Sequence, residues 1–195
     1  MPLQNRVTPT GELVAVPERG RWMGNRGRLH DGHRTVVRHH QGRRWISCRL
    51  QFRDRHREVM TPGSYTELFF ADEATAFAAG HRPCVECRRA AWLRLGAVLG
   101  VRKVEEVDAV LQAERLNPAG DRKRRHRLPG RDLPDGTMLE LDGRPWLLAG
   151  GEVRLWTPGG YGRVRPRPDG EVEVLTPPTL VRALTDGYEL DQADQ

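Results

Sequence analysis

The sequence has 195 residues, 32 Lys plus Arg against 26 Asp plus Glu, a net charge of +6 at pH 7, and 37% hydrophobic residues. No apolar run approaches the roughly 18 residues of a membrane span, and the N-terminus lacks the basic and apolar regions of a secretory signal. We therefore expect a cytoplasmic protein with no membrane partner. The three cysteines, two of them in a Cys-x-x-Cys, indicate metal or thiol chemistry rather than a disulfide framework.

The positive charge is concentrated in one segment. Between Arg19 and Arg57 there are twelve Arg and two acids, a local charge of +10, which leaves −4 for the remainder. Guanidinium groups suit bidentate phosphate recognition, and interleaved Trp rings can stack on bases. We expect this segment to bind DNA, or alternatively RNA, although a solvated basic face has the same composition. The expected contact residues are Trp22, Arg26, Arg28, Arg34, Arg38, Arg43, Arg44 and Trp45.

Short strands broken by glycine are predicted for residues 1 to about 60. Glu12–Val16 is one candidate strand and Arg44–Phe52 a better one. In the second, alternate residues form an apolar face: Ile46, Cys48, Leu50 and Phe52. The tract at 20–34, between the two strands, has no periodicity and is interpreted as a functional loop.

Helices are predicted in the middle of the chain. Residues 65–80 predict a short strand and then a helix that Asp72 would N-cap and Gly80 would close. Residues 83–99 predict a second helix, with Pro in its first turn. Residues 104–116 predict a third, apolar on one face.

The C-terminal part has a different pattern. Residues 117–136 are basic and aperiodic, which predicts a linker or long loop. From residue 137 to about 176 the pattern has period two, which predicts an antiparallel sheet, and Pro178–Thr185 predicts a last helix. Three pairs are candidate hairpin turns: Asp142-Gly143, Gly150-Gly151 and Asp169-Gly170.

The expected fold class is α+β. A small mixed zinc-binding domain with its helices would occupy residues 1–116, and the basic linker residues 117–136. Residues 137–195 would form a small antiparallel β-rich domain that ends in a helix.

The sharpest chemical feature is GHRPCVECRR, residues 80–89. Cys84 and Cys87 can face one cation, and the amides of a following helix would stabilise their thiolates, which predicts a zinc knuckle. Cys48 is the expected third ligand, with an ordinary buried cysteine as the alternative. A redox Cys-x-x-Cys is the competing interpretation of the pair. The fourth ligand is open, and the candidates are His81, His30, His33 and His40, with His39 and His56 in the same part of the chain.

The run ELFFADEATAFAAGHRPCVECRR, together with Ile46-Ser47-Cys48-Arg49, resembles the zinc-binding domain of the Ada DNA alkylation-repair family over Trp45 to Arg89. The resemblance implies a zinc-bound domain that contacts the DNA backbone, with Cys84, Cys87 and Cys48 as ligands. In that family the cysteine matching Cys48 also accepts methyl groups from DNA phosphotriesters. Here Phe52 stands where the family has a further cysteine, and His81 replaces an aromatic residue, so the chemistry is left open.

The resulting hypothesis is a zinc-containing DNA-binding protein associated with DNA repair or damage recognition. One alternative is a metal-dependent nuclease or other hydrolase, because His30, Asp31 and His33 offer a base and a carboxylate in a Gly-rich loop. Alkyl transfer to Cys48 would be another enzymatic activity. A further alternative is a non-catalytic interaction module.

Overall fold

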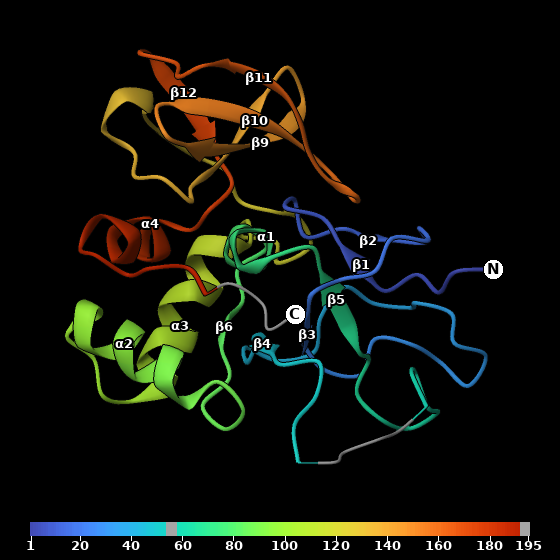
Figure 1. The fold of residues 1–195 in the computed structure, drawn as a ribbon. Helices are drawn as coiled ribbons and strands as arrows, with labels where there is room; N and C mark the ends of the chain where they lie inside the picture. The colour runs from blue at the N-terminus through green and yellow to red at the C-terminus, as the bar shows by residue number, and fades with distance from the viewer. Residues whose placement is uncertain (54–57, 192–195) are drawn as a thin grey trace.

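The computed structural model describes residues 1–53 and 58–191. Within these residues, two six-stranded sheets and four α-helices form the fold (Figure 1). The predicted α+β class is therefore confirmed.

The first sheet has the order β2-β1-β5-β3-β4-β6 and is mixed, because β1 pairs with β5 and β4 with β6 in parallel. Its strands are β1 (Arg6–Val7), β2 (Leu13–Val14), β3 (Trp22–Asn25), β4 (Ile46–Cys48), β5 (Leu68–Phe70) and β6 (Arg82–Pro83).

Two predictions for this sheet are corrected. Strand β3 lies inside the tract that was interpreted as a functional loop, where Gly24 hides the alternation. A Cβ at Gly24 would lie 2.1 Å from the carbonyl oxygen of Ile46, so the close approach of β4 requires glycine. Strand β4 ends at Cys48, and the predicted apolar face does not continue, because Leu50 is 47% exposed.

The helices are α1 (Glu73–Ala78), α2 (Arg89–Leu99), α3 (Val104–Arg115) and α4 (Pro178–Thr185). Asp72 caps α1, accepting the Thr75 N–H at 2.7 Å, and Gly80 follows the helix with a left-handed φ of 85°, as predicted. The predicted start of the second helix at Pro83 is wrong, because Pro83 belongs to β6 and residues 84–88 form a turn.

The second sheet is antiparallel, with the order β11-β10-β9-β8-β12-β7. Its strands are β7 (His126–Pro129), β8 (Met138–Leu141), β9 (Arg144–Ala149), β10 (Glu152–Thr157), β11 (Gly160–Pro166) and β12 (Glu171–Val174), and a short 3-10 helix, Gly130–Asp132, follows β7.

Two features of this sheet differ from the sequence prediction. The segment predicted to be a linker, residues 117–136, contains β7 and the 3-10 helix. β7 is an edge strand with alternate residues exposed, and this exposure explains why its sequence is polar. The predicted turns Asp142-Gly143 and Gly150-Gly151 join strands that pair with each other, β8 with β9 and β9 with β10. Asp169-Gly170 lies between β11 and β12, but these strands do not pair, because β12 pairs with β8 and β7. β10 and β11 meet at Pro158-Gly159, a turn that was not predicted.

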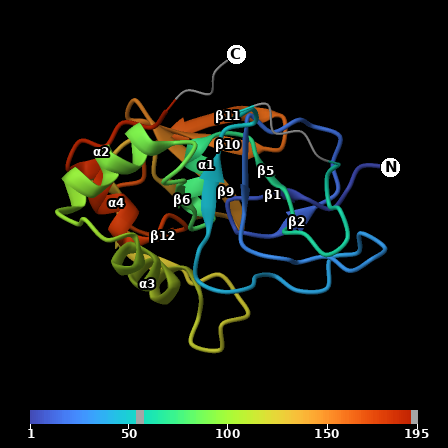
Figure 2. The ribbon, with the colours of Figure 1, turned by 90° about the horizontal axis from the view of Figure 1, so that it is seen from below.

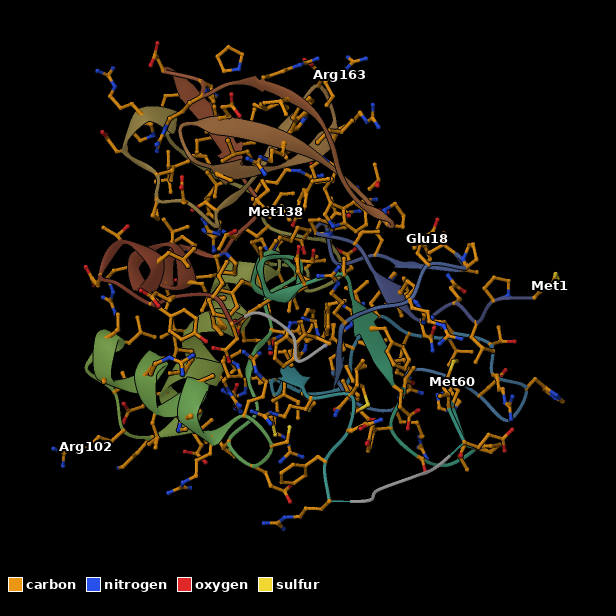
Figure 3. The ribbon with its side chains drawn as sticks, viewed as in Figure 1. Met1, Glu18, Met60, Arg102, Met138 and Arg163 are labelled. Atoms are coloured by element: carbon orange, nitrogen blue, oxygen red, sulfur yellow. The ribbon has the colours of Figure 1, made fainter. Side chains whose placement is uncertain are left out.

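Helix α1 joins the two sheets. All six of its residues are buried: Ala76 packs in the core of the first sheet, whereas Ala74 packs with Met138 and Trp156 of the second. Met138 can be seen beside α1 in Figure 3. Helix α4 packs against α2 and α3, so the C-terminal end of the chain returns to the first half (Figure 2). In the described residues no helix has the length and apolar character needed to span a bilayer.

Candidate metal centre

Strand pairing brings Cys48 next to Cys84. Parallel strands β4 and β6 place Ile46 opposite Arg82 and Ser47 opposite Pro83, and the N–H of Cys84 donates to the Ser47 carbonyl oxygen at 2.9 Å. The next residue along each segment is a cysteine: Cys48 ends β4, and Cys84 directly follows β6. This register, which links residues far apart in the chain, creates the cluster.

The turn at residues 84–88 then brings in Cys87. The N–H of Arg88 donates to the Cys84 carbonyl oxygen at 3.1 Å, and the N–H of Glu86 lies 3.4 Å from the Cys84 sulfur. Helix α2 begins at Arg89, so its positive N-terminal end lies close to Cys87. Amide donors and a helix N-terminus both stabilise negative sulfur.

The three sulfur atoms lie within 4.8 Å of one another. Ligands at about 2.3 Å around a tetrahedral metal are roughly 3.8 Å apart, so a small closure would fit one ion. Cys48 and Cys84 are buried, Cys87 is partly buried, and all three are free thiols. The described residues thus contain a three-cysteine group that could hold a metal ion.

The three thiols interact strongly with one another. Hydrogen bonding from the Cys48 and Cys87 thiols lowers the pKa of Cys84 to about 2, and the amide of Glu86 adds to this effect. The same interaction with Cys84 raises the pKa of Cys48, and burial raises it further. A bound cation would stabilise thiolates at these positions.

The histidines proposed as the fourth ligand lie elsewhere. His81 is fully buried between Phe70 and Trp45, with ring centroids 4.7 and 5.2 Å away, and burial lowers its pKa. His40 Nε2 is 3.0 Å from the Gly120 carbonyl oxygen. His33 and His39 are exposed, and His56 lies outside the described residues. Among the described residues, the cluster consists of the three cysteines.

The His30/Asp31/His33 loop is a polar turn. His30 is 4% exposed, with Nδ1 2.7 Å from the Thr66 hydroxyl and Nε2 3.2 Å from the Thr61 carbonyl oxygen. The Asp31 carboxylate accepts the backbone N–H groups of His33 and Thr35, which lower its pKa. Both ring nitrogens of His30 are therefore engaged, and the geometry does not favour a hydrolytic base.

Three residues expected to touch nucleic acid are inside the protein. Trp22 and Trp45 are 4% and 3% exposed, and Arg26 is 1% exposed. The Arg88 guanidinium lies 4.0 Å from the Trp22 ring, and Arg115 and Arg26 lie 4.0 and 4.7 Å from the Trp45 ring. Their stacking partners are internal, which corrects the expectation that these rings stack on bases.

The other arginines that were expected to contact nucleic acid lie at or near the surface. Arg34 is half-buried and pairs with Glu58. The exposed members of this expected set are Arg28, Arg38, Arg43 and Arg44. Two of them, Arg28 and Arg44, line a hollow of about 530 Å³ whose wall also includes Cys84. Tyr65, which is 38% exposed, lines the same hollow and was missed in the sequence; its only local signal is an aromatic residue in a Pro-Gly-Ser-Tyr turn.

Comparisons with protein-family models, with curated proteins and with solved structures find no match to this chain. The functional argument therefore depends on the geometry of the cysteine cluster and of the surface beside it.

Proposed function

We propose that this chain binds a zinc ion through Cys48, Cys84 and Cys87 and binds DNA through the exposed arginines beside that centre. The observation that carries the proposal is the shared hollow, which is lined by Arg28, Arg44 and Cys84. The metal would then hold in place the surface that contacts phosphates.

The donor set supports zinc. Three thiolates favour soft or borderline ions, whereas Mg²⁺ and Ca²⁺ prefer oxygen ligands. When bound, zinc would supply a structural cross-link between β4 and the turn at residues 84–88.

The charge distribution supports a polyanionic partner. Arg28, Arg38, Arg43 and Arg44 come from one segment, and their guanidinium groups are exposed. If these four each neutralise a phosphate, log K should fall against log salt with a slope of about −3.6. The involvement in DNA repair rests on the sequence resemblance alone.

Metal analysis tests the first half of the proposal. We expect one zinc per purified chain, and its loss in Cys84→Ser and Cys87→Ser. His33→Ala, which removes an exposed candidate ligand outside the cluster, should retain the zinc. Full zinc content in both cysteine variants would overturn the metal centre.

DNA binding is tested with a labelled 20-base-pair duplex by fluorescence anisotropy at several salt concentrations. Arg28→Gln/Arg44→Gln should weaken binding and make the slope shallower by about 1.8. Arg154→Gln/Arg163→Gln removes the same charge from exposed positions on the second sheet and should bind like wild type. Arg163 is labelled on that sheet in Figure 3. Equal affinities of the two double variants for the DNA duplex, or no binding of the duplex by wild type, would reject the interface. Tighter binding of an RNA duplex than of the DNA duplex would redirect the proposal to RNA.

A further inference from the structure

A second hollow, of about 510 Å³, lies where the segment after α3 folds back on the first sheet. The Lys123 ammonium donates to the carbonyl oxygen of Ala78 in α1, and the carbonyl oxygen of Gly120 lies 3.0 Å from His40 Nε2. The loop after α3, which can be followed in Figure 2, thereby brings a second group of basic residues against the first. The cationic residues of the lining are Arg26, Arg115, Arg122, Lys123 and Arg125.

Three of these cations reach the interior without a carboxylate partner. Arg26 and Arg115 are each 1% exposed, and the Lys123 ammonium donates its hydrogen bond to Ala78, which is fully buried. Arg26 donates to the Gly11 carbonyl oxygen at 2.8 Å, and Arg115 donates to carbonyl oxygens and to the Gln112 amide. Within residues 1–53 and 58–191, none of the three forms an ion pair with a carboxylate.

Unused donors remain in the same place. The Nε atoms of Arg26 and Arg115 are buried and have no hydrogen-bond partner in the described structure. Buried charges and buried donors without partners are costly, and an anion in the hollow would compensate both.

The cations also share one electrostatic field. Burial lowers the pKa of Arg26 and of Arg115 to about 9 each. Burial lowers the pKa of Lys123 to about 7, with further contributions from Arg115, Arg125 and Arg26. The positive charges of Arg26 and Arg115 therefore act on each other and on Lys123, and all three residues line the hollow.

The acids near this space do not neutralise it. Glu12 and Asp121 are exposed residues of the lining. Glu140 and Glu173 pair with Arg125. Asp108 acts favourably on Arg115, and Glu114 on Lys123, but Asp108 is paired with Arg82 and Glu114 accepts hydrogen bonds from Thr179. These acids offset the cations only in part.

We propose that the hollow framed by Arg26, Arg115 and Lys123 binds a small phosphorylated ligand. Guanidinium forks match phosphate oxygens, and three cations suit a dianion. The volume lies within the roughly 300–1,000 Å³ of pockets that hold small organic molecules, which favours a phosphate ester over the bare ion. Trp45 is already stacked on two guanidiniums, so recognition depends on the phosphate rather than on an aromatic base.

The experiment is calorimetric titration of the full chain, in buffer free of phosphate and sulfate, with ribose 5-phosphate, AMP and inorganic phosphate. Ribose and adenosine, which lack the phosphate, are the control ligands. The phosphate esters should bind and raise Tm by several degrees, whereas ribose and adenosine should do neither. Absence of binding by every phosphate probe would overturn the proposal.

The chain offers a matched pair of variants, because its two lysines are Lys103 and Lys123. Lys123→Met removes a half-buried charge that has no carboxylate partner, so it should fold, and it should weaken ribose 5-phosphate binding at least tenfold. Lys103→Met removes an exposed lysine at the start of α3 and should bind like wild type. Equal affinities of the two variants would overturn the site.

The site is independent of the proposed DNA interface, and the same variants separate the two. Arg28→Gln/Arg44→Gln should bind ribose 5-phosphate normally, and Lys123→Met should bind duplex DNA normally. If the duplex displaces ribose 5-phosphate and Lys123→Met weakens both, the hollow belongs to the nucleic-acid surface, and the small-ligand proposal fails.

Discussion

The guanidinium of Arg88 lies 2.5 Å from the carboxylate of Glu73, and each side chain is only 1% exposed. Arg88 directly follows Cys87, and it also donates to the Ser47 hydroxyl at 2.7 Å and to Asp191 at 2.9 Å. Glu73 in turn accepts the Tyr188 hydroxyl at 3.1 Å. One buried ion pair therefore ties the cysteine turn, β4, α1 and the end of the chain together.

Arg88→Met should lower the free energy of unfolding by about 3–5 kcal/mol, because it leaves the Glu73 carboxylate buried without its cation. Arg88→Met/Glu73→Gln should lose less unfolding free energy than Arg88→Met, because neither charge of the buried pair remains. Urea unfolding measures both. Arg94→Met breaks the more exposed pair with Asp191 and should cost about 1 kcal/mol or less. Equal losses from Arg88→Met and Arg94→Met would contradict the central role of the buried pair.

Gly24→Ala should reduce metal content although it changes no ligand. The new Cβ would lie 2.1 Å from the Ile46 carbonyl oxygen, so β3 and β4 must separate and Cys48 must move. Gly32→Ala is the matched control, since a Cβ there has no atom within 4 Å. Metal analysis and Tm should separate the two variants, and retention of full zinc by Gly24→Ala would show that β4 tolerates the displacement.

Trp45→Ala should cost about 3–5 kcal/mol in unfolding free energy, because a buried aromatic ring leaves a cavity. Trp45→Phe should be milder and should leave DNA affinity within about twofold of wild type, because the ring is 3% exposed and packs internally. Unfolding and anisotropy measurements test both statements. A tenfold loss of DNA affinity in folded Trp45→Phe would restore the ring as a base-stacking surface.

Stability should rise with pH between about 7 and 10.5 through Lys123. Burial lowers the pKa of this lysine in the folded state to about 7 from 10.5, so the unfolded chain binds more protons across that interval. The contribution is up to about 1.4 kcal/mol per pH unit. Urea unfolding in phosphate-free buffer should show a steeper rise in wild type and Lys103→Met than in Lys123→Met, and identical slopes in all three would refute the shift.

Local sequence determined the features that depend on neighbouring residues. The Asp72 cap and the C-terminal end of α2 before Gly100 follow from capping residues, and α3 and α4 follow from periodicity, because these signals act within a few residues of the chain. Pairing of Cys84 with Cys87 in one turn is equally local. The sequence by itself also determined that the charge is concentrated between Arg19 and Arg57.

Only the tertiary structure decided which of these residues meet and which face the solvent. Cys48 joins the cluster because β4 and β6 pair in parallel, a contact between segments more than thirty residues apart. The sequence predicts Arg26 and Trp45 to be part of a nucleic-acid surface, but both are buried, and Arg115 from α3 lies on the Trp45 ring beside Arg26. Burial and strand register depend on distant partners. For that reason the basic segment contributes exposed arginines to one surface and the buried Arg26 to a hollow whose other cations come from later in the chain.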